Sequence, residues 1–329
     1  MIFGKDNIIN LAVVIPAFNE EQTVRAVIKE CLEATKKIPK SYIYVYNNNS
    51  TDKTVEEVKK INSAKVILKN CDEQGKGSVI RKAFRQIHAK CLIMLDADLT
   101  YPATAIPKLY KKLITEDLDM VIGDRLSSTY FKENKRPFHN FGNMLIRKSI
   151  NTLFKADIKD ILTGFRAFSY KFIKSCPVLS SGFTVETEMS IYAIENRMSI
   201  DNEIIEYKDR PNGSTSKLNT YSDGIKALKT IMRLFRSYHP LAYFGTLAFF
   251  IAFVFGIIAI IRCFIPYFET GLVTNFPTLI VCGLAFIAAI ISLFSGLILD
   301  SIVQQDKRNF ELVLNQWEEN EWNEYSKNR

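Results

Sequence analysis

The sequence is poor in the residues that build zinc sites and disulfide frameworks. It has only 3 histidines, and its 6 cysteines are scattered without a CxxC pair. This spacing indicates neither kind of site, so we expect reduced, buried thiols in a cytosolic domain. No run of basic residues interleaved with aromatics marks a nucleic-acid groove, so nucleic acid is set aside as a partner. The formal charge of +8 instead suits nucleotides or phospholipids.

Charged residues are missing from two long stretches, Tyr243 to Ile261 and Phe276 to Leu299. Each is close to the roughly 20 apolar residues that a helix needs to cross a bilayer. The alternative is a pair of buried core helices, which seldom extend so far without a polar stripe. No signal-peptide pattern precedes the first strand, so we expect the two spans to direct the chain to the membrane.

The distribution of charge around the two spans predicts their orientation. The segment from Tyr207 to His239 carries seven basic and two acidic residues, whereas the loop between the spans carries only Glu269 beyond Arg262. The positive-inside rule therefore places the large N-terminal domain in the cytosol. Two spans return residues 300–329 to the same side.

Just before the first span, apolar and basic residues recur at helical spacing. The apolar stripe is Ile225, Leu228, Ile231, Met232 and Phe235, and the basic stripe is Lys226, Lys229, Arg233 and Arg236. This pattern predicts a helix lying in the headgroup layer, and the alternative is a helix docked on the large domain. The predicted parts are a cytosolic domain (1–222), an interfacial helix (223–240), two transmembrane helices with a short loop (241–299) and a tail (300–329).

The N-terminal domain alternates short apolar runs with helical patterns. The predicted strands are Leu11–Ile15, Tyr42–Tyr46, Lys65–Leu68, Cys91–Leu95 and Met120–Ile122, and the predicted helices include Ser78–His88 and Thr104–Ile114. Asn19 is expected to cap the first helix, with Glu20 and Glu21 at its positive end. Such alternation is typical of an α/β fold with a mostly parallel sheet covered on both faces. Ligands of these sheets bind at the carboxyl ends of the strands.

The triplet Asp96-Ala97-Asp98 directly follows one of these strands. Two carboxylates at this spacing can bind a hard cation together with a bridging diphosphate. Mg²⁺ or Mn²⁺ there would neutralise the charge that grows on a departing nucleoside diphosphate. The alternative is a pair of aspartates that cap a turn.

Three further motifs precede this triplet: VVIPAFNEE (13–21), NNNSTDKT (47–54) and GKGSVIR (75–81). The triplet itself lies in a fourth motif, LDADLTYP (95–102). With these motifs the chain resembles the family-two inverting glycosyltransferases of GT-A fold. It is most similar to the polyprenyl-phosphate sugar synthases, the relatives of dolichol-phosphate mannose synthase. The resemblance covers roughly Leu11 to Leu218. It implies a nucleotide-sugar donor, linked to UDP or GDP, and a metal-dependent hexosyl transfer.

The resemblance assigns expected roles to residues near the nucleotide. Pro16, Ala17 and Glu20 match the loop that lies over the nucleoside. Asn48 takes the place of an acidic residue that contacts the base, and an amide oxygen can also accept a hydrogen bond. Lys76 belongs to a GKG loop whose backbone approaches the sugar nucleotide; it is not a Walker A loop, since the spacing differs.

The resemblance continues beyond the metal motif. Arg125 matches an arginine near the diphosphate. Thr163 and Gly164, in the segment DILTGFRAF, would border the sugar, while Arg166 could face phosphate or brace the fold. Glu186 and Glu188 match a position near the acceptor, and ordinary N-terminal helix charge is their alternative explanation.

A final motif, DRPNGSTSKL (209–218), resembles a mobile segment that closes over phosphates. Arg210 and Lys217 are its candidate phosphate ligands. The alternative is a solvated loop.

The sequence therefore predicts sugar transfer to a polyprenyl phosphate at the membrane. A phosphate acceptor needs no strong general base, whereas a sugar hydroxyl would need one, with Glu186 or Glu188 the best placed. Transfer to a glycan or a glycerolipid hydroxyl is the first alternative. The second is a catalytically inactive scaffold, supported only by asparagines at 47 and 48 where the family has aspartates. The sequence also leaves open a homo-oligomer that forms through the membrane helices or the tail.

Overall fold

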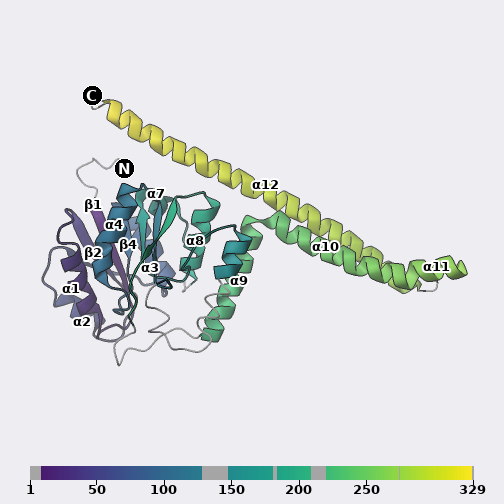
Figure 1. The fold of residues 1–329 in the computed structure, drawn as a ribbon, viewed down its shortest axis with the longest axis horizontal. Helices are drawn as coiled ribbons and strands as arrows, with labels where there is room; N and C mark the ends of the chain where they lie inside the picture. Colours follow the sequence, from purple (N-terminus) through teal and green to yellow (C-terminus); the bar gives the residue numbers. More distant parts are fainter. Residues whose placement is uncertain (1–8, 128–146, 181–183, 209–219, 274, 328–329) are drawn as a thin grey trace. The chain divides into compact units, whose positions relative to one another are not determined.

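The computed structural model describes residues 9–127, 147–180, 184–208, 220–273 and 275–327. The chain forms two compact units, Met1–Ile231 and Met232–Arg329. The first contains a sheet with helices on both faces, and the second consists of long helices (Figure 1). All six cysteines are buried and none forms a disulfide.

The first unit is built on a seven-stranded mixed sheet of order β3-β2-β1-β4-β6-β5-β7. Its strands are β1 (Ile9–Ala17), β2 (Ser41–Asn47), β3 (Val66–Asn70), β4 (Ala89–Met94), β5 (Met120–Asp124), β6 (Arg166–Ser169) and β7 (Ile200–Ile204). All paired strands are parallel except β6, which is antiparallel to both β4 and β5. The first residue of β6 therefore lies at the edge where β4 and β5 end.

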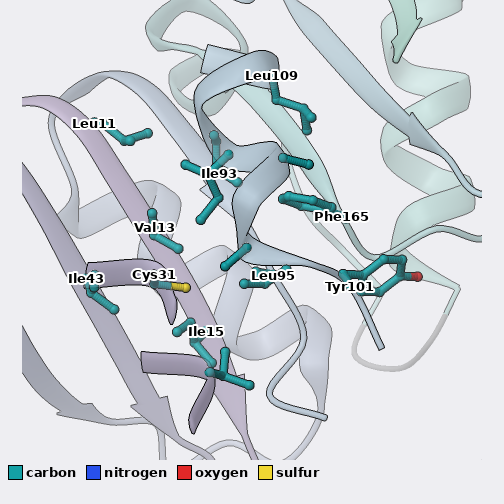
Figure 2. Close-up of a cluster of buried hydrophobic side chains, with 14 of the residues drawn as sticks. Leu11, Val13, Ile15, Cys31, Ile43, Ile93, Leu95, Tyr101, Leu109 and Phe165 are labelled. Carbon is teal, nitrogen blue, oxygen red and sulfur yellow. The ribbon is translucent and has the colours of Figure 1, made fainter. Parts of the chain in front are cut away.

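Helices cover both faces of this sheet, so its central strands are apolar on both sides. The helices of the first unit are α1 (Val24–Ala34), α2 (Thr54–Lys59), α3 (Lys76–Gln86), the 3₁₀ turn Ala103–Ala105, α4 (Ile106–Thr115), α7 (Tyr170–Ser175) and α8 (Val185–Glu195). Alternate residues of β1 and β4, including Val13 and Ile93, pack with α1 and α4 in the main core (Figure 2). On the other face, Phe84 of α3 and Phe172 of α7 meet edge to face with ring centroids 6.2 Å apart.

The tertiary structure confirms the predicted α/β class and the five predicted strands, and it adds β6 and β7, which the sequence pattern did not reveal. One prediction was wrong. Asn19 does not cap α1, which begins at Val24 without a side-chain cap and without acidic residues in its first turn. Asn19 instead adopts a positive φ of 53° and accepts a hydrogen bond from the backbone N–H of Thr51 at 2.8 Å. Asparagine tolerates this left-handed conformation better than most residues.

The second unit is a helical hairpin. Helix α9 (Thr220–Tyr238) runs across the boundary between the units, and α10 (Pro240–Ala259), a π-helical turn (Ile260–Phe264), α11 (Ile265–Thr270) and α12 (Phe276–Lys327) follow. Helices α10 and α12 lie side by side (Figure 1). A Cβ built on Gly296 would lie 3.0 Å from the Cβ of Phe244, so this glycine allows the two helices to approach closely.

Two stretches of this hairpin are long and apolar enough to cross a membrane, Pro240–Thr270 and Phe276–Gln316. Only 11% and 17% of their most apolar windows are buried, which is the opposite of what a pair of core helices would show. Both predicted spans fall within these stretches. Helix α12 continues as one helix to Lys327, so the predicted tail is helical up to that residue.

Candidate active site

The loops at one edge of the sheet carry the predicted site. They follow β1, β2, β4 and β5, and the loop before β6 reaches the same edge because β6 runs in the opposite direction. Residues far apart in the sequence are thereby brought together, as the parallel topology predicts.

The predicted nucleoside loop begins inside β1. Pro16 and Ala17 are the last residues of the strand, and the buried Ala17 accepts a hydrogen bond from the backbone N–H of Asn48 at 2.9 Å. The backbone N–H of Glu20 donates to the hydroxyl of Thr54 at 2.8 Å. The loops after β1 and β2 are therefore tied to each other, and Pro16, Ala17 and Glu20 lie beside the Asn48 loop as one unit.

Asn48 is buried, and its side chain holds the loop that leads to α3. Its amide group donates to the carbonyls of Cys71 at 3.0 Å and Glu73 at 2.8 Å, and its Oδ1 accepts from the N–H of Gly75 at 2.7 Å. Both amide hydrogens are thus used within the protein. Asn48 therefore shapes the GKG loop, and an aspartate could not donate to these carbonyls. The base contact through its amide oxygen stays a prediction.

Lys76 is the first residue of α3 and reaches two carboxylates. Its Nζ lies 2.5 Å from Asp96 Oδ1 and 2.8 Å from Glu186 Oε1. Burial alone would lower the pKa of the ammonium, but the charges of Asp96 and Glu186 outweigh it and leave the pKa above its ordinary value. Gly75, with φ of 117°, directs the chain into this position, a backbone conformation that only glycine adopts readily.

Gly164 closes over this ion pair. A Cβ built on it would lie 2.3 Å from Asp96 Oδ2 and 2.7 Å from Lys76 Nζ, far inside contact distance. The backbone of the loop before β6 therefore packs directly on the Lys76–Asp96 pair. Only glycine leaves room for both groups.

We expect Gly164→Ala to displace Asp96 and Lys76 and to weaken binding of a nucleoside diphosphate by at least about tenfold, since misplacing site groups by an ångström is costly. Isothermal titration with UDP and GDP in the presence of Mn²⁺ measures this. The matched control is Gly245→Ala, because a Cβ on that glycine meets nothing within 4 Å. Equal affinities of the two variants would contradict the close packing.

Asp98 is buried and held by the turn that follows it. Its Oδ1 accepts from the backbone N–H of Thr100 at 3.1 Å and from the Thr100 hydroxyl at 2.6 Å. Asp96 remains partly exposed, with Ala97 buried between the two aspartates. The structure shows the turn-capping alternative at Asp98, and cation binding by the triplet stays a prediction.

The donor chemistry of this triplet fits a divalent cation. Mg²⁺ is usually bound by one or two carboxylates and completes its shell with water and substrate phosphates. Within the part of the chain that the structure describes, no three His, Cys, Asp or Glu side chains gather as a metal cluster. Asp96 and Asp98 are the two carboxylates of the triplet that could hold such a cation.

Arg125 joins the same network from β5. Its Nε lies 2.8 Å from Asp160 Oδ2, and its Nη1 donates to the hydroxyl of Tyr101 at 3.3 Å. That hydroxyl accepts from the N–H of Gly164 at 3.2 Å and lies 3.5 Å from the buried hydroxyl of Thr163. The ring of Tyr101 packs at the rim of the core while its oxygen points away from it (Figure 2).

Tyr101 and Asp160 were not among the predicted site residues. Both stand inside motifs quoted from the sequence, LDADLTYP and DILTGFRAF. Their place in these motifs was the signal that could have identified them as site residues. Their role depends on the antiparallel placement of β6, which the sequence pattern did not show.

Arg166 makes the contacts of a residue that braces the fold, the second of its two predicted roles. Its side chain is completely buried. Its guanidinium donates to the carbonyls of Thr163 at 3.0 Å and Ile161 at 2.5 Å, and to the hydroxyl of Ser190 at 2.8 Å. Burial lowers the pKa of Arg166 to about 10, which still leaves the group charged at neutral pH. The guanidinium fixes the loop that carries Gly164 instead of facing a phosphate.

The two glutamates of α8 have different positions. Glu186 faces Lys76, as described above. Glu188 accepts from the backbone N–H groups of Leu179 at 3.1 Å and Ser180 at 2.8 Å, while Arg81 binds the carbonyl of Val178 at 2.8 Å from the other side. Both oxygens of Glu188 thus hold the loop before α8, and its catalytic role stays a prediction.

Arg210 and Lys217, the predicted phosphate ligands, lie outside the described residues. The chain that leads to them is described up to Lys208, whose backbone N–H donates to the carbonyl of Thr100 at 3.1 Å. Tyr207 lies edge to face on Tyr101, with ring centroids 6.0 Å apart. The segment therefore leaves the domain next to the Asp96–Asp98 loop.

Comparison with known proteins places this geometry among sugar-transferring enzymes. The family model described as Glycosyl transferase family 2 matches residues 12–176. Glycosyltransferase AglJ of Haloferax volcanii is 30% identical over 240 residues, which is 73% of this chain and 76% of the relative. The dolichol-phosphate mannosyltransferase of Pyrococcus furiosus is 27% identical over 189 residues, 55% of this chain and 52% of the relative.

A solved structure shares the fold. Glucosyl-3-phosphoglycerate synthase of Mycobacterium tuberculosis, crystallised with Mn²⁺, UDP and glucosyl-3-phosphoglycerate, matches with a TM-score of 0.55 at 20% identity. The match covers 68% of this chain and 78% of that one. At this identity it establishes the common GT-A fold, and its ligands are properties of that enzyme.

Proposed function

Because the chain belongs to glycosyl transferase family 2, we propose that it transfers a sugar from a nucleotide-sugar to a polyprenyl phosphate, with inversion. An oxygen of the lipid phosphate bonds to the anomeric carbon while the bond from that carbon to the nucleoside diphosphate breaks. The diphosphate leaves with the electron pair. The similarity to a dolichol-phosphate mannosyltransferase supports this acceptor class.

One observation carries the proposal: charged side chains from five separate segments meet at the sheet edge. Lys76, Asp96 and Glu186 form one group, and Arg125 pairs with Asp160. The hydroxyl of Tyr101 joins Arg125 to the backbone of Gly164, which lies against Lys76 and Asp96. Such an arrangement presents cations and carboxylates where a metal-bound diphosphate can be held. Mg²⁺ or Mn²⁺, when bound by Asp96 and Asp98, would stabilise charge on the departing diphosphate.

The chain's own groups supply the remaining functions. Arg125 would orient the diphosphate, and Thr163 and Gly164 would border the sugar. Arg210 and Lys217 remain proposed as cations that join when the segment after Lys208 closes, which would exclude water from the reacting atoms.

A phosphate acceptor also suits the two glutamates. Glu188 uses both oxygens on backbone amides, and Glu186 is paired with Lys76. Glu186 keeps one buried oxygen without a hydrogen-bond partner among the described residues, so it is the glutamate that a hydroxyl acceptor would use as a base. A phosphate oxygen is already anionic near neutral pH, with a second pKa of about 6, and reacts without such a base.

We further propose that α9 lies in the headgroup layer on the cytosolic side. Its exposed apolar residues are Ile225, Leu228 and Met232, and its exposed basic residues are Lys229, Arg233 and Arg236. On a helical projection these side chains occupy one continuous face, and Pro240 begins the first candidate span directly afterwards. Basic side chains at this depth attract anionic lipids and would bring the lipid phosphate close to the catalytic domain.

The function is tested with membranes that contain the full chain. Labelled UDP- and GDP-sugars are supplied with polyprenyl phosphate, diacylglycerol or a glycan primer. We expect a labelled, mild-acid-labile polyprenyl product from one nucleotide-sugar. Labelled glycerolipid or extended glycan would replace the proposed acceptor, and a chain that binds no nucleoside diphosphate would be a scaffold.

A further inference from the structure

We propose that Lys76 closes the cation site while no substrate is bound: its ammonium occupies the place beside Asp96 and must leave before a divalent cation can bind there. The inference rests on the proposed function and adds a control step to it. Metal and nucleotide would then bind together, because the diphosphate offers Lys76 a new partner.

The first argument is the occupation of Asp96. Its Oδ1 is in contact with Lys76 Nζ at 2.5 Å, and its Oδ2 lies against Gly164, where a Cβ would be 2.3 Å away. One oxygen is therefore occupied by an ammonium and the other lies beside Gly164, while the side chain as a whole stays 27% exposed. A cation approaching this carboxylate meets a positive charge already in place, and like charges at such a distance repel strongly.

The second argument is that the ammonium is enclosed. The Lys76 side chain is only 10% exposed, and its second carboxylate, Glu186, is 4% exposed. The other oxygen of Glu186 is buried and has no hydrogen-bond partner among the described residues. Glu186 thus holds Lys76 through a second ion pair, which makes it a positioning residue for the lysine.

The third argument is that Lys76 is able to move. It stands at the first position of α3, next to Gly75, and its four-carbon stem carries a compact charge with freely rotating donors. Helix N-termini also attract phosphate groups. A diphosphate bound near the start of α3 can therefore draw the ammonium away from Asp96 and expose the carboxylate.

This arrangement predicts opposite effects of one substitution on two ligands. Lys76→Met keeps the length of the side chain and removes its charge. We expect Mn²⁺ to bind this variant about tenfold more tightly than the wild type without nucleotide, a coupling of ordinary size. UDP and GDP without metal should bind about tenfold more weakly, because a phosphate contact is lost. A purely structural role for Lys76 would weaken both.

The experiment uses the full chain in detergent micelles, and circular dichroism confirms that each variant is folded. Free Mn²⁺ is measured from its electron paramagnetic resonance signal, first alone and then with saturating UDP or GDP. Lys76→Arg retains the charge and should bind Mn²⁺ as weakly as the wild type. Lys69→Met, at an exposed position on β3, is the control for loss of a lysine charge.

Each outcome decides the proposal. Tighter Mn²⁺ binding by Lys76→Met, with no change in Lys76→Arg and Lys69→Met, supports it. Unchanged or weaker Mn²⁺ binding by Lys76→Met, in a variant that still binds nucleotide, overturns it while leaving the proposed function intact. Wild-type protein that binds UDP or GDP but never Mn²⁺ also overturns it. If no variant binds either nucleotide, the proposed function itself fails.

Discussion

Replacing Asp98 by asparagine will lower the rate of sugar transfer by at least about a hundredfold, because it removes a negative charge from the proposed cation site. Asparagine has nearly the same shape, and its Oδ1 can still accept from the backbone and hydroxyl of Thr100. The turn after β4 should therefore persist. The loss would arise from charge rather than from unfolding, which a substitution by alanine could not separate.

Asp117→Asn is the matched control for this substitution. Asp117 is exposed, lies in the turn between α4 and β5, and has a positive φ of 48° that asparagine tolerates. We expect this control to transfer sugar at the wild-type rate. The measurement is formation of labelled lipid product at saturating nucleotide-sugar and Mn²⁺. Near-normal turnover by the Asp98→Asn protein would show that Asp98 only stabilises the turn after β4 and does not bind the cation.

Replacing Arg166 by methionine will destabilise the first unit by about 3 kcal/mol or more, since buried polar groups left without partners cost about 1–3 kcal/mol each. The carbonyls of Thr163 and Ile161 and the hydroxyl of Ser190 would all lose a donor. Lysine should not restore the stability, because one ammonium cannot reproduce the three-way fork of the guanidinium.

Thermal unfolding of the full chain in detergent, followed by circular dichroism, measures this effect. For a domain of this size we expect the first transition to fall by about 6–12 °C. Arg85→Met is the control, because Arg85 is exposed in the last turn of α3. An Arg166→Met protein as stable as this control would show that Arg166 does not brace the fold, and phosphate binding would then be its remaining predicted role.

The contrast between Arg166 and Asp98 shows which properties of a residue a sequence motif can predict. Asp98 was assigned from a local pattern, two carboxylates directly after an apolar strand, and the structure places it at that strand end. Arg166 also stands in a motif, but its role depends on Ile161, Thr163 and Ser190, which only the folded chain brings around it. A motif gives the position of a residue and does not give its partners.

The two glutamates of α8 also show that a position in the sequence does not give a residue's partners. Glu186 and Glu188 are two residues apart and have the same side chain, so the sequence predicted the same role for both. In the helix they point in different directions, one toward Lys76 and the other toward the amides of Leu179 and Ser180. The difference comes from the loops packed against each face of α8.

The sequence by itself determined five of the strands and their order, together with a basic amphipathic helix and two uncharged spans. These depend on periodicities within a few residues, which local backbone geometry fixes. Only the tertiary structure decided that Lys76 lies between Asp96 and Glu186, and that Gly164 covers the pair. The physical reason is the antiparallel insertion of β6 between β4 and β5, a long-range pairing that no local pattern specifies.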